Sequence, residues 1–330
     1  MRLSVLDQSV SVSGSTEDAA IRDTLDLAQH CERLGYHRYW LSEHHALPTI
    51  VGSAPEILMA AIAARTERIR IGSAGVMLPH YSALKVAEQF RVLEALAPGR
   101  IDLGVGRAPG GDLRTARALN PHAAGGAEDF PEQVRDLQAW TSQPSHLGIA
   151  ALPRGPHAPE VWILGSSDYG AQLAAHFGLP YAYAYFFVDG QGVEQALDLY
   201  RSLYRPSARH PAPQATICVW ALAADSHAQA CHAATSRERW RVDRARGVLG
   251  PLQAPDAIVQ RGFDAADLPT VEAMRRKALV GTGAEVAGMI RALGTRLGLD
   301  EMVVNTWAHD PAVRRRSYAL LAQAFGLSAG

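Results

Sequence analysis

The chain has 330 residues, of which 48% are hydrophobic and 20% charged, a composition typical of a globular protein with a large core. Its 32 basic and 33 acidic side chains give a formal net charge of −1, which argues against nucleic acid or an anionic membrane as the partner. Signal-peptide and membrane-spanning patterns are missing, and the three cysteines form no CxxC motif, so we expect a cytoplasmic protein.

Short apolar runs alternate with longer helical patterns along the chain. In the first half, strands are predicted at 3–7, 37–41, 69–78 and 100–106, followed by helices near 18–34, 54–65, 83–96 and 128–140. In the second half, strands are predicted at 161–165, 181–188, 216–224 and 301–307, followed by helices near 169–177, 192–204, 226–245 and 311–325. Gly35 is expected to end the first helix, and Thr282 with Glu285 has the spacing of a capping box.

Eight strand–helix units with nearly continuous apolar strands predict a parallel sheet covered by helices. An open doubly wound sheet also alternates in this way, but eight units without a dinucleotide motif favour a single α/β domain over 1–330, a (β/α)8 TIM barrel. Two segments interrupt the alternation, the proline-rich loop 142–159 and an insertion at 247–284 before the last helix–strand unit. An insertion of that length is expected to act as a lid.

The motif EHH follows the second predicted strand, at the end where barrel enzymes place their active sites. Glu43, His44 and His45 could ligate a metal, but adjacent side chains on an extended segment point in opposite directions, and HExxH spacing is missing. We therefore predict no metal site. A histidine that transfers protons is the better interpretation, with a buried hydrogen-bonding role as the alternative for His45.

Two other strand ends favour a phosphate site. The segment GVGRAPGG at 104–111 lacks the third glycine of a dinucleotide loop and cannot open a helix directly, but it presents Arg107, a residue suited to bidentate phosphate binding. Ser166 and Ser167 precede a predicted helix, so hydroxyl groups and free N–H groups would meet there. Alternatively, Arg107 is an ordinary surface arginine in a glycine-rich turn, and the serines form an ordinary helix N-cap. Taken together, the two motifs favour binding of a phosphorylated cofactor or substrate.

At this point four motifs resemble those of bacterial luciferase-like, flavin-dependent monooxygenases: WLSEHH (40–45), IGSAGVMLP (71–79), VAEQFRVLEALAPGRIDLGVGR (86–107) and AAHFGLP (174–180). The resemblance implies a barrel that binds FMN. It places the cofactor phosphate on Arg107, Ser166, Ser167 and the Gly170 backbone, and it places Ala74–Gly75, as a non-prolyl cis peptide, against the isoalloxazine. It also implies that His44 is the catalytic histidine, with Glu43 supporting it and His45 nearby. Gly106 stands beside the flavin where the luciferase alpha chain has a reactive cysteine, so light emission is not expected.

By the same resemblance, a separate NAD(P)H-dependent flavin reductase supplies reduced FMN. The reduced cofactor reacts with O2, through a flavin C4a-hydroperoxide, to oxygenate a small organic substrate. Aromatic residues at 181–187, with Trp220 and Trp307, suggest a bulky aromatic or polyketide-like substrate. The alternatives are a deazaflavin-dependent oxidoreductase of the same fold, a metal-dependent hydrolase and a non-catalytic flavin-binding protein. The alanine-rich helix 54–64 and the habit of the family predict a homodimer.

Overall fold

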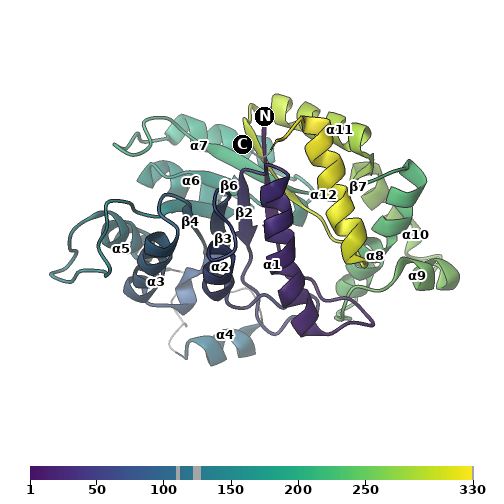
Figure 1. Cartoon of the computed structure of the whole chain (residues 1–330), viewed down its shortest axis with the longest axis horizontal. Coiled ribbons are helices and arrows are strands. Elements are labelled where there is room, and N and C mark those ends of the chain that lie inside the picture. Colours follow the sequence, from purple (N-terminus) through teal and green to yellow (C-terminus); the bar gives the residue numbers. More distant parts are fainter. Residues whose placement is uncertain (109–111, 122–127, 329–330) are drawn as a thin grey trace. The chain divides into compact units, whose positions relative to one another are not determined.

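The computed structural model describes residues 1–108, 112–121 and 128–328, so the end of the segment GVGRAPGG (109–111) lies outside the described residues. The chain divides into two compact units (Figure 1). Unit 1 comprises Met1–His37, Leu47–Gly52 and Cys218–Gly330, and unit 2 comprises Arg38–Ala46 and Ser53–Ile217. Each unit is described by itself below.

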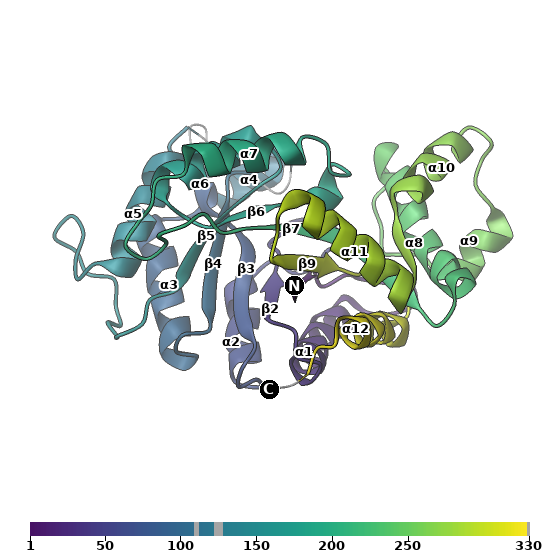
Figure 2. The ribbon, with the colours of Figure 1, turned by 90° about the horizontal axis from the view of Figure 1, so that it is seen from above.

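Unit 2 is a run of parallel strands, each followed by helical segments. The strands pair in the order β2–β3–β4–β5–β6, and β6 also pairs with the first residues of β7. Helices α2 and α3 lie side by side, as do α6 and α7 (Figure 2). The strands are β2 (Arg38–Leu41), β3 (Arg70–Met77), β4 (Ile101–Gly106), β5 (Glu160–Gly165), β6 (Tyr181–Tyr183) and β7 (Ala215–Ala224). The helices are α2 (Pro55–Ala63), α3 (Ala83–Leu96), α4 (Leu113–Leu119), α5 (Phe130–Ser142), α6 (Asp168–Phe177) and α7 (Val193–Leu203), with the 3-10 turns η1 (Leu78–His80) and η3 (Tyr185–Phe187).

Unit 1 holds the remaining strands, in the order β1–β9–β7–β8, with β1 parallel to β9 and β7 parallel to β8. Helices α8, α9 and α10 form one group and α11 packs along α12. The strands are β1 (Arg2–Asp7), β8 (Leu279–Thr282) and β9 (Glu301–Asn305), together with residues 218–224 of β7. The helices are α1 (Glu17–Arg33), α8 (His227–Ala245), α9 (Pro255–Arg261), α10 (Leu268–Lys277), α11 (Gly283–Leu297) and α12 (Pro311–Phe325).

Parallel strands that alternate with helices in this order form a (β/α)8 TIM barrel, so the predicted fold class is confirmed. Local signals are confirmed as well. Gly35 ends α1 with a φ of +83°, and a Cβ there would lie 2.4 Å from the Ser328 carbonyl oxygen, so only glycine fits. Thr282 and Glu285 form the reciprocal capping box of α11.

Two predicted segments differ from the structure. The strand predicted at 181–188 stops after Tyr183, because the chain turns into η3 and continues through Asp189 and Gly190, both at positive φ. The predicted insertion 247–284 contains α9, α10 and the additional strand β8, which pairs with the end of β7. Its role as a lid stays a prediction.

In the described ranges, no helix combines the length and apolar character needed to cross a membrane.

Candidate functional site

All ten candidate catalytic and cofactor-binding residues lie in unit 2, on or directly after four neighbouring parallel strands. One group follows β2, a second lies within β3, a third ends β4 and a fourth follows β5 into α6. Neighbouring parallel strands end at one edge of a sheet, where barrel enzymes carry their chemistry. These residues are Glu43, His44, His45, Ala74, Gly75, Gly106, Arg107, Ser166, Ser167 and Gly170.

The carboxylate of Glu43 is the most highly connected group after β2. It is 2% exposed and accepts hydrogen bonds from His45 Nε2 at 2.7 Å, from the Tyr81 hydroxyl at 2.5 Å and from the Met77 backbone N–H at 3.0 Å. Burial first, and then the hydrogen bond and charge of Glu43, raise the pKa of Tyr81, so its phenol keeps its proton and donates. Glu43 thereby fixes the end of β2 to the end of β3.

His44 has a different neighbour. Its Nδ1 lies 3.1 Å from the Ser42 hydroxyl, and its side chain is half-buried. Residues i and i+2 of an extended segment share a side, so Ser42 pairs with His44 while Glu43 pairs with His45. The resemblance implies that Glu43 supports His44; in the structure the Glu43 carboxylate accepts a hydrogen bond from His45. Within the described ranges, no three His, Cys, Asp or Glu side chains gather as metal ligands.

The centre of β3 contains an unusual backbone feature. The peptide bond between Ala74 and Gly75 is cis, as the resemblance predicted, and the pairing register with β4 shifts at this point. A Cβ on Gly75 would lie 2.7 Å from the carbonyl oxygen of Gly104, so the two backbones approach more closely than a side chain would permit. Ala74 and Gly75 are both half-buried, so part of this segment remains accessible.

The junction between β5 and α6 has the features of an anion site. Ser167 is the N-cap of α6, yet its side chain caps no backbone N–H, so the hydroxyl and the N–H groups of the first turn are available. Gly170 packs tightly, because a Cβ there would lie 3.3 Å from Cε2 of Tyr181. Arg107 is exposed, and its guanidinium carbon lies 3.9 Å from the ring centroid of Tyr169 in the same first turn. An arginine stacked on the first turn, the Ser167 hydroxyl and the start of a helix are therefore found at this junction, and these are donor types that bind phosphate in proteins.

Three residues of this site were missed by sequence reasoning. Ser42, Tyr81 and Tyr169 contact predicted residues, but each is of a common type without motif spacing. For Ser42, the i, i+2 rule on an extended segment could have indicated the contact with His44. For Tyr81 and Tyr169, which lie 38 and 62 positions from their partners Glu43 and Arg107 in the chain, no local pattern could have indicated the contact.

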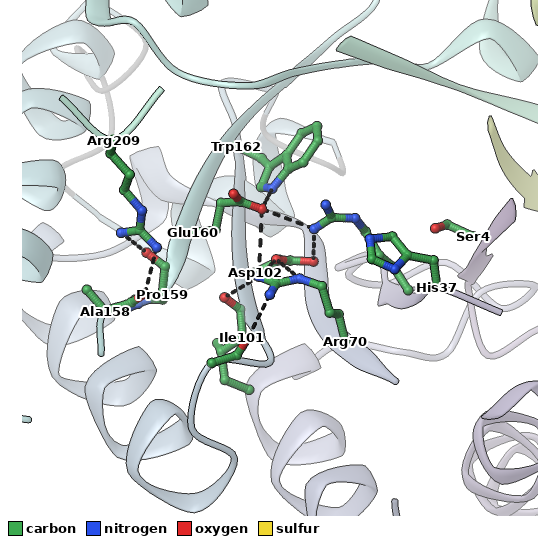
Figure 3. A network of polar contacts seen from close by, with 12 residues as sticks. Ser4, His37, Arg70, Ile101, Asp102, Ala158, Pro159, Glu160, Trp162 and Arg209 are labelled. Carbon is green, nitrogen blue, oxygen red and sulfur yellow. Dashed lines mark hydrogen bonds and ion pairs between the residues drawn. The ribbon is translucent and has the colours of Figure 1, made fainter. Parts of the chain in front are cut away.

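The opposite, amino-terminal ends of these strands carry a buried ionic network (Figure 3). Asp102 is fully buried and accepts hydrogen bonds from Arg38 at 2.8 Å, from Trp40 at 2.8 Å and from Arg70 at 3.0 Å. Glu160 accepts from Arg38 at 3.1 Å, and it also accepts from the Trp162 indole. Paired charges of this kind at the amino-terminal end of barrel strands serve stability rather than chemistry.

A cavity of about 430 Å³ adjoins this network. None of the ten predicted site residues lines it, and Arg209 in its wall already donates to the carbonyl oxygens of Ala158 and Pro159 at 2.7 and 3.0 Å (Figure 3). The cavity therefore lies apart from the strand ends that carry the predicted chemistry. Its lining residues are Arg70, Gly99, Ile101, Ser142, Pro156, His157, Ala158, Glu160 and Arg209.

Comparison with protein families decides the identity of the chain. Residues 1–301 match the model of the luciferase-like monooxygenases. The chain belongs to the luciferase-like monooxygenase family. It is thus an oxidoreductase of the monooxygenase type, as the resemblance predicted.

Relatives in this family align along nearly the whole length. A luciferase-like monooxygenase of Escherichia coli is 40% identical over 318 residues, covering 96% of this chain and 95% of the relative. An N-acetyl-S-alkylcysteine monooxygenase of Bacillus subtilis is 34% identical over 336 residues, covering 98% of both chains.

Solved structures of luciferase-like proteins agree with the fold. Apo-MsnO8 superposes with a TM-score of 0.92 at 36% identity, covering 99% of this chain and 98% of the other. Two more distant structures share the fold. The oxygenating constituent of 3,6-diketocamphane monooxygenase from Pseudomonas putida, in complex with FMN, has a TM-score of 0.73 at 18% identity, covering 99% of this chain and 98% of the other. An F420-dependent secondary alcohol dehydrogenase has a TM-score of 0.71 at 14% identity, covering 98% of each chain.

Proposed function

We propose that this protein is an FMN-dependent monooxygenase that uses reduced FMN and O2 to oxygenate an organic substrate. The observation that carries the proposal is the set of donors at the start of α6, where the Arg107 guanidinium stacks on Tyr169 of the first turn and the Ser167 side chain makes no cap bond. The FMN complex of the diketocamphane monooxygenase supports this choice of cofactor on the same fold. The F420-dependent neighbour makes a deazaflavin the competing cofactor.

The chain would hold the cofactor through backbone and polar groups. Arg107 neutralises the phosphate charge, Ser166 and Ser167 donate hydroxyl hydrogen bonds, and the N–H of Gly170 adds the field of the helix end. The backbone at Ala74–Gly75, which is half-buried, would lie against the isoalloxazine, as the resemblance implies. When bound and reduced, FMN supplies the two electrons that activate O2, so that one oxygen atom enters the substrate and the other leaves as water.

The histidine after β2 would handle the proton of this reaction. His44 carries the proton to or from the oxygen that is transferred, and the Ser42 hydroxyl at Nδ1 fixes the orientation of its ring. Glu43 would act through the groups that it holds in place. Its bonds to His45, Tyr81 and the Met77 N–H keep the segment that bears His44 in place.

The substrate would meet the carboxyl ends of the strands in unit 2. Tyr181 and Tyr183 are buried and donate to the backbone carbonyls of Ser167 and Gln191, so these two rings belong to the core. Phe187 in η3 is 58% exposed and is the aromatic residue of this segment best placed for a bulky substrate. The similarity to an N-acetyl-S-alkylcysteine monooxygenase leads us to propose thioethers as a further substrate class.

A separate NAD(P)H-dependent flavin reductase would deliver reduced FMN in the cytoplasm, where the thiols of Cys31, Cys218 and Cys231 stay reduced.

We also propose a homodimer that forms through α2 and α3. The apolar side chains of Ile57, Val92 and Leu96 on these helices are 67%, 48% and 59% exposed. Sedimentation should give twice the monomer mass of 35.5 kDa, and a monomeric mass at micromolar concentration would contradict the dimer.

Rapid mixing of the reduced FMN complex with oxygenated buffer tests the function. We expect O2 to be consumed before the oxidised flavin absorbance returns, because a protected site slows the loss of hydrogen peroxide or, with substrate, of water that regenerates the oxidised cofactor. A panel containing an N-acetyl-S-alkylcysteine and a bulky aromatic compound should yield product labelled from ¹⁸O2. A deazaflavin oxidoreductase would bind F420 in preference to FMN and need no O2, and a non-catalytic flavin binder would show no delay and no product.

A further inference from the structure

The side chain of Arg107 is ordered by an aromatic ring. Its guanidinium carbon lies 3.9 Å from the centroid of the Tyr169 ring, well within the distance of about 6 Å at which a cation and an aromatic face attract each other. Arg107 follows β4, whereas Tyr169 lies in the first turn of α6, so the contact joins two neighbouring strand–helix junctions. An exposed arginine otherwise samples many rotamers, and this stacking selects a narrow set of them.

The rest of the α6 N-terminus is arranged to leave room for an anion. Asp168 is the acidic residue of the first turn, and its carboxylate would repel a phosphate. However, its Oδ2 accepts a hydrogen bond of 2.7 Å from Gln195 Nε2 on α7, which holds the carboxylate toward that helix. The Ser167 side chain makes no cap bond that a ligand would have to break. The donors are therefore in place before any ligand arrives.

We propose that Tyr169 is a positioning residue, which orients Arg107 for the terminal phosphate of FMN and thereby sets the preference of this site for FMN over riboflavin. The inference rests on the proposed function. Its physical basis is preorganisation, because a guanidinium that is already ordered loses less conformational entropy when the phosphate binds. Tyr169 itself does not need its hydroxyl group for this role, since the ring face makes the contact.

Fluorescence titration of the full-length protein with oxidised FMN and with riboflavin tests the inference. Tyr169→Leu should weaken FMN binding about two- to tenfold, the entropic cost of ordering one flexible side chain when the phosphate binds, and leave riboflavin binding unchanged. Tyr169→Phe should bind FMN as the wild type does, because it keeps the ring. In an Arg107→Ala background, Tyr169→Leu should cause no further loss, because its effect acts through the guanidinium.

Two further measurements separate this role from general damage. Arg135→Ala removes an exposed guanidinium on α5 and should leave both titrations unchanged, which controls for net charge. Circular dichroism checks that each variant is folded. An equal loss for FMN and riboflavin, or an equal loss in Tyr169→Phe and Tyr169→Leu, would overturn the role of Tyr169. A wild-type protein without preference for FMN over riboflavin would instead overturn the phosphate site and the proposed function with it.

Discussion

His44→Ala is expected to lower coupled product formation by about 10²- to 10⁴-fold, the range that general acid–base catalysis contributes, while FMN binding stays unchanged. His44 is half-buried after β2, and its ring is oriented by the Ser42 hydroxyl at 3.1 Å, so the alanine variant removes the proton carrier without opening the core. O2 consumption should continue, but hydrogen peroxide should replace the oxygenated product. The measurement is the ratio of product to peroxide in air-saturated buffer.

His45→Ala is the matched control for this prediction. His45 hydrogen-bonds to the buried Glu43 carboxylate, so its loss should reduce stability more than His44→Ala does and reduce product formation less. Ser42→Ala should give an intermediate loss of product formation, because His44 is then present but less well oriented. If His45→Ala abolishes coupling and His44→Ala does not, the two histidines must exchange roles.

Asp102→Asn is expected to destabilise the protein by about 3–5 kcal/mol, the cost of removing one partner from a buried ion pair. The Asp102 side chain is 0% exposed, and its charge is shared between Arg38 and Arg70. Asparagine preserves the shape but leaves both guanidinium groups undercompensated. Urea unfolding measures the loss, and Glu132→Gln, which breaks the exposed pair with Arg135, should leave the unfolding midpoint unchanged. A small loss in Asp102→Asn would show that the network relaxes around the missing charge.

The buried contacts of Asp102 with Arg38 and Arg70 also predict that the stability of the protein depends on pH. Burial alone would raise the pKa of Asp102, but Arg38 and Arg70, with hydrogen bonds from Arg70 and Trp40, lower it below its ordinary value of 3.8. A depressed carboxyl pKa stabilises the folded state above the unfolded pKa, and that stabilisation disappears as the pH falls through the folded pKa. The difference in stability between wild type and Asp102→Asn should therefore be constant at neutral pH and shrink below about pH 4. A difference that stays constant in acid would contradict the assignment.

Features that depend on nearby residues could be predicted from the sequence. The barrel strands follow from apolar runs, the capping box of Thr282 and Glu285 from a three-residue spacing, and the candidate loops from their places at strand ends. Partner choice between distant residues could not be predicted. The hydrogen bonds that Glu43 accepts from the Tyr81 hydroxyl and the Met77 N–H, 38 and 34 positions away in the chain, have no local signal. The strand β8 was missed because four residues carry too little pattern without knowledge of their partner β7.

Three glycines on β3 and β4 differ in what they permit a protein engineer to change. A Cβ on Gly104 would lie 2.2 Å from the Ser73 carbonyl oxygen, and one on Gly75 would press on Leu164 and on Gly104, so these two positions are closed to substitution. Among the described residues, none has an atom within 4 Å of a Cβ added to Gly106, which lies next to Arg107. It is thus the position where random libraries can vary size and polarity at the strand end without disturbing the barrel.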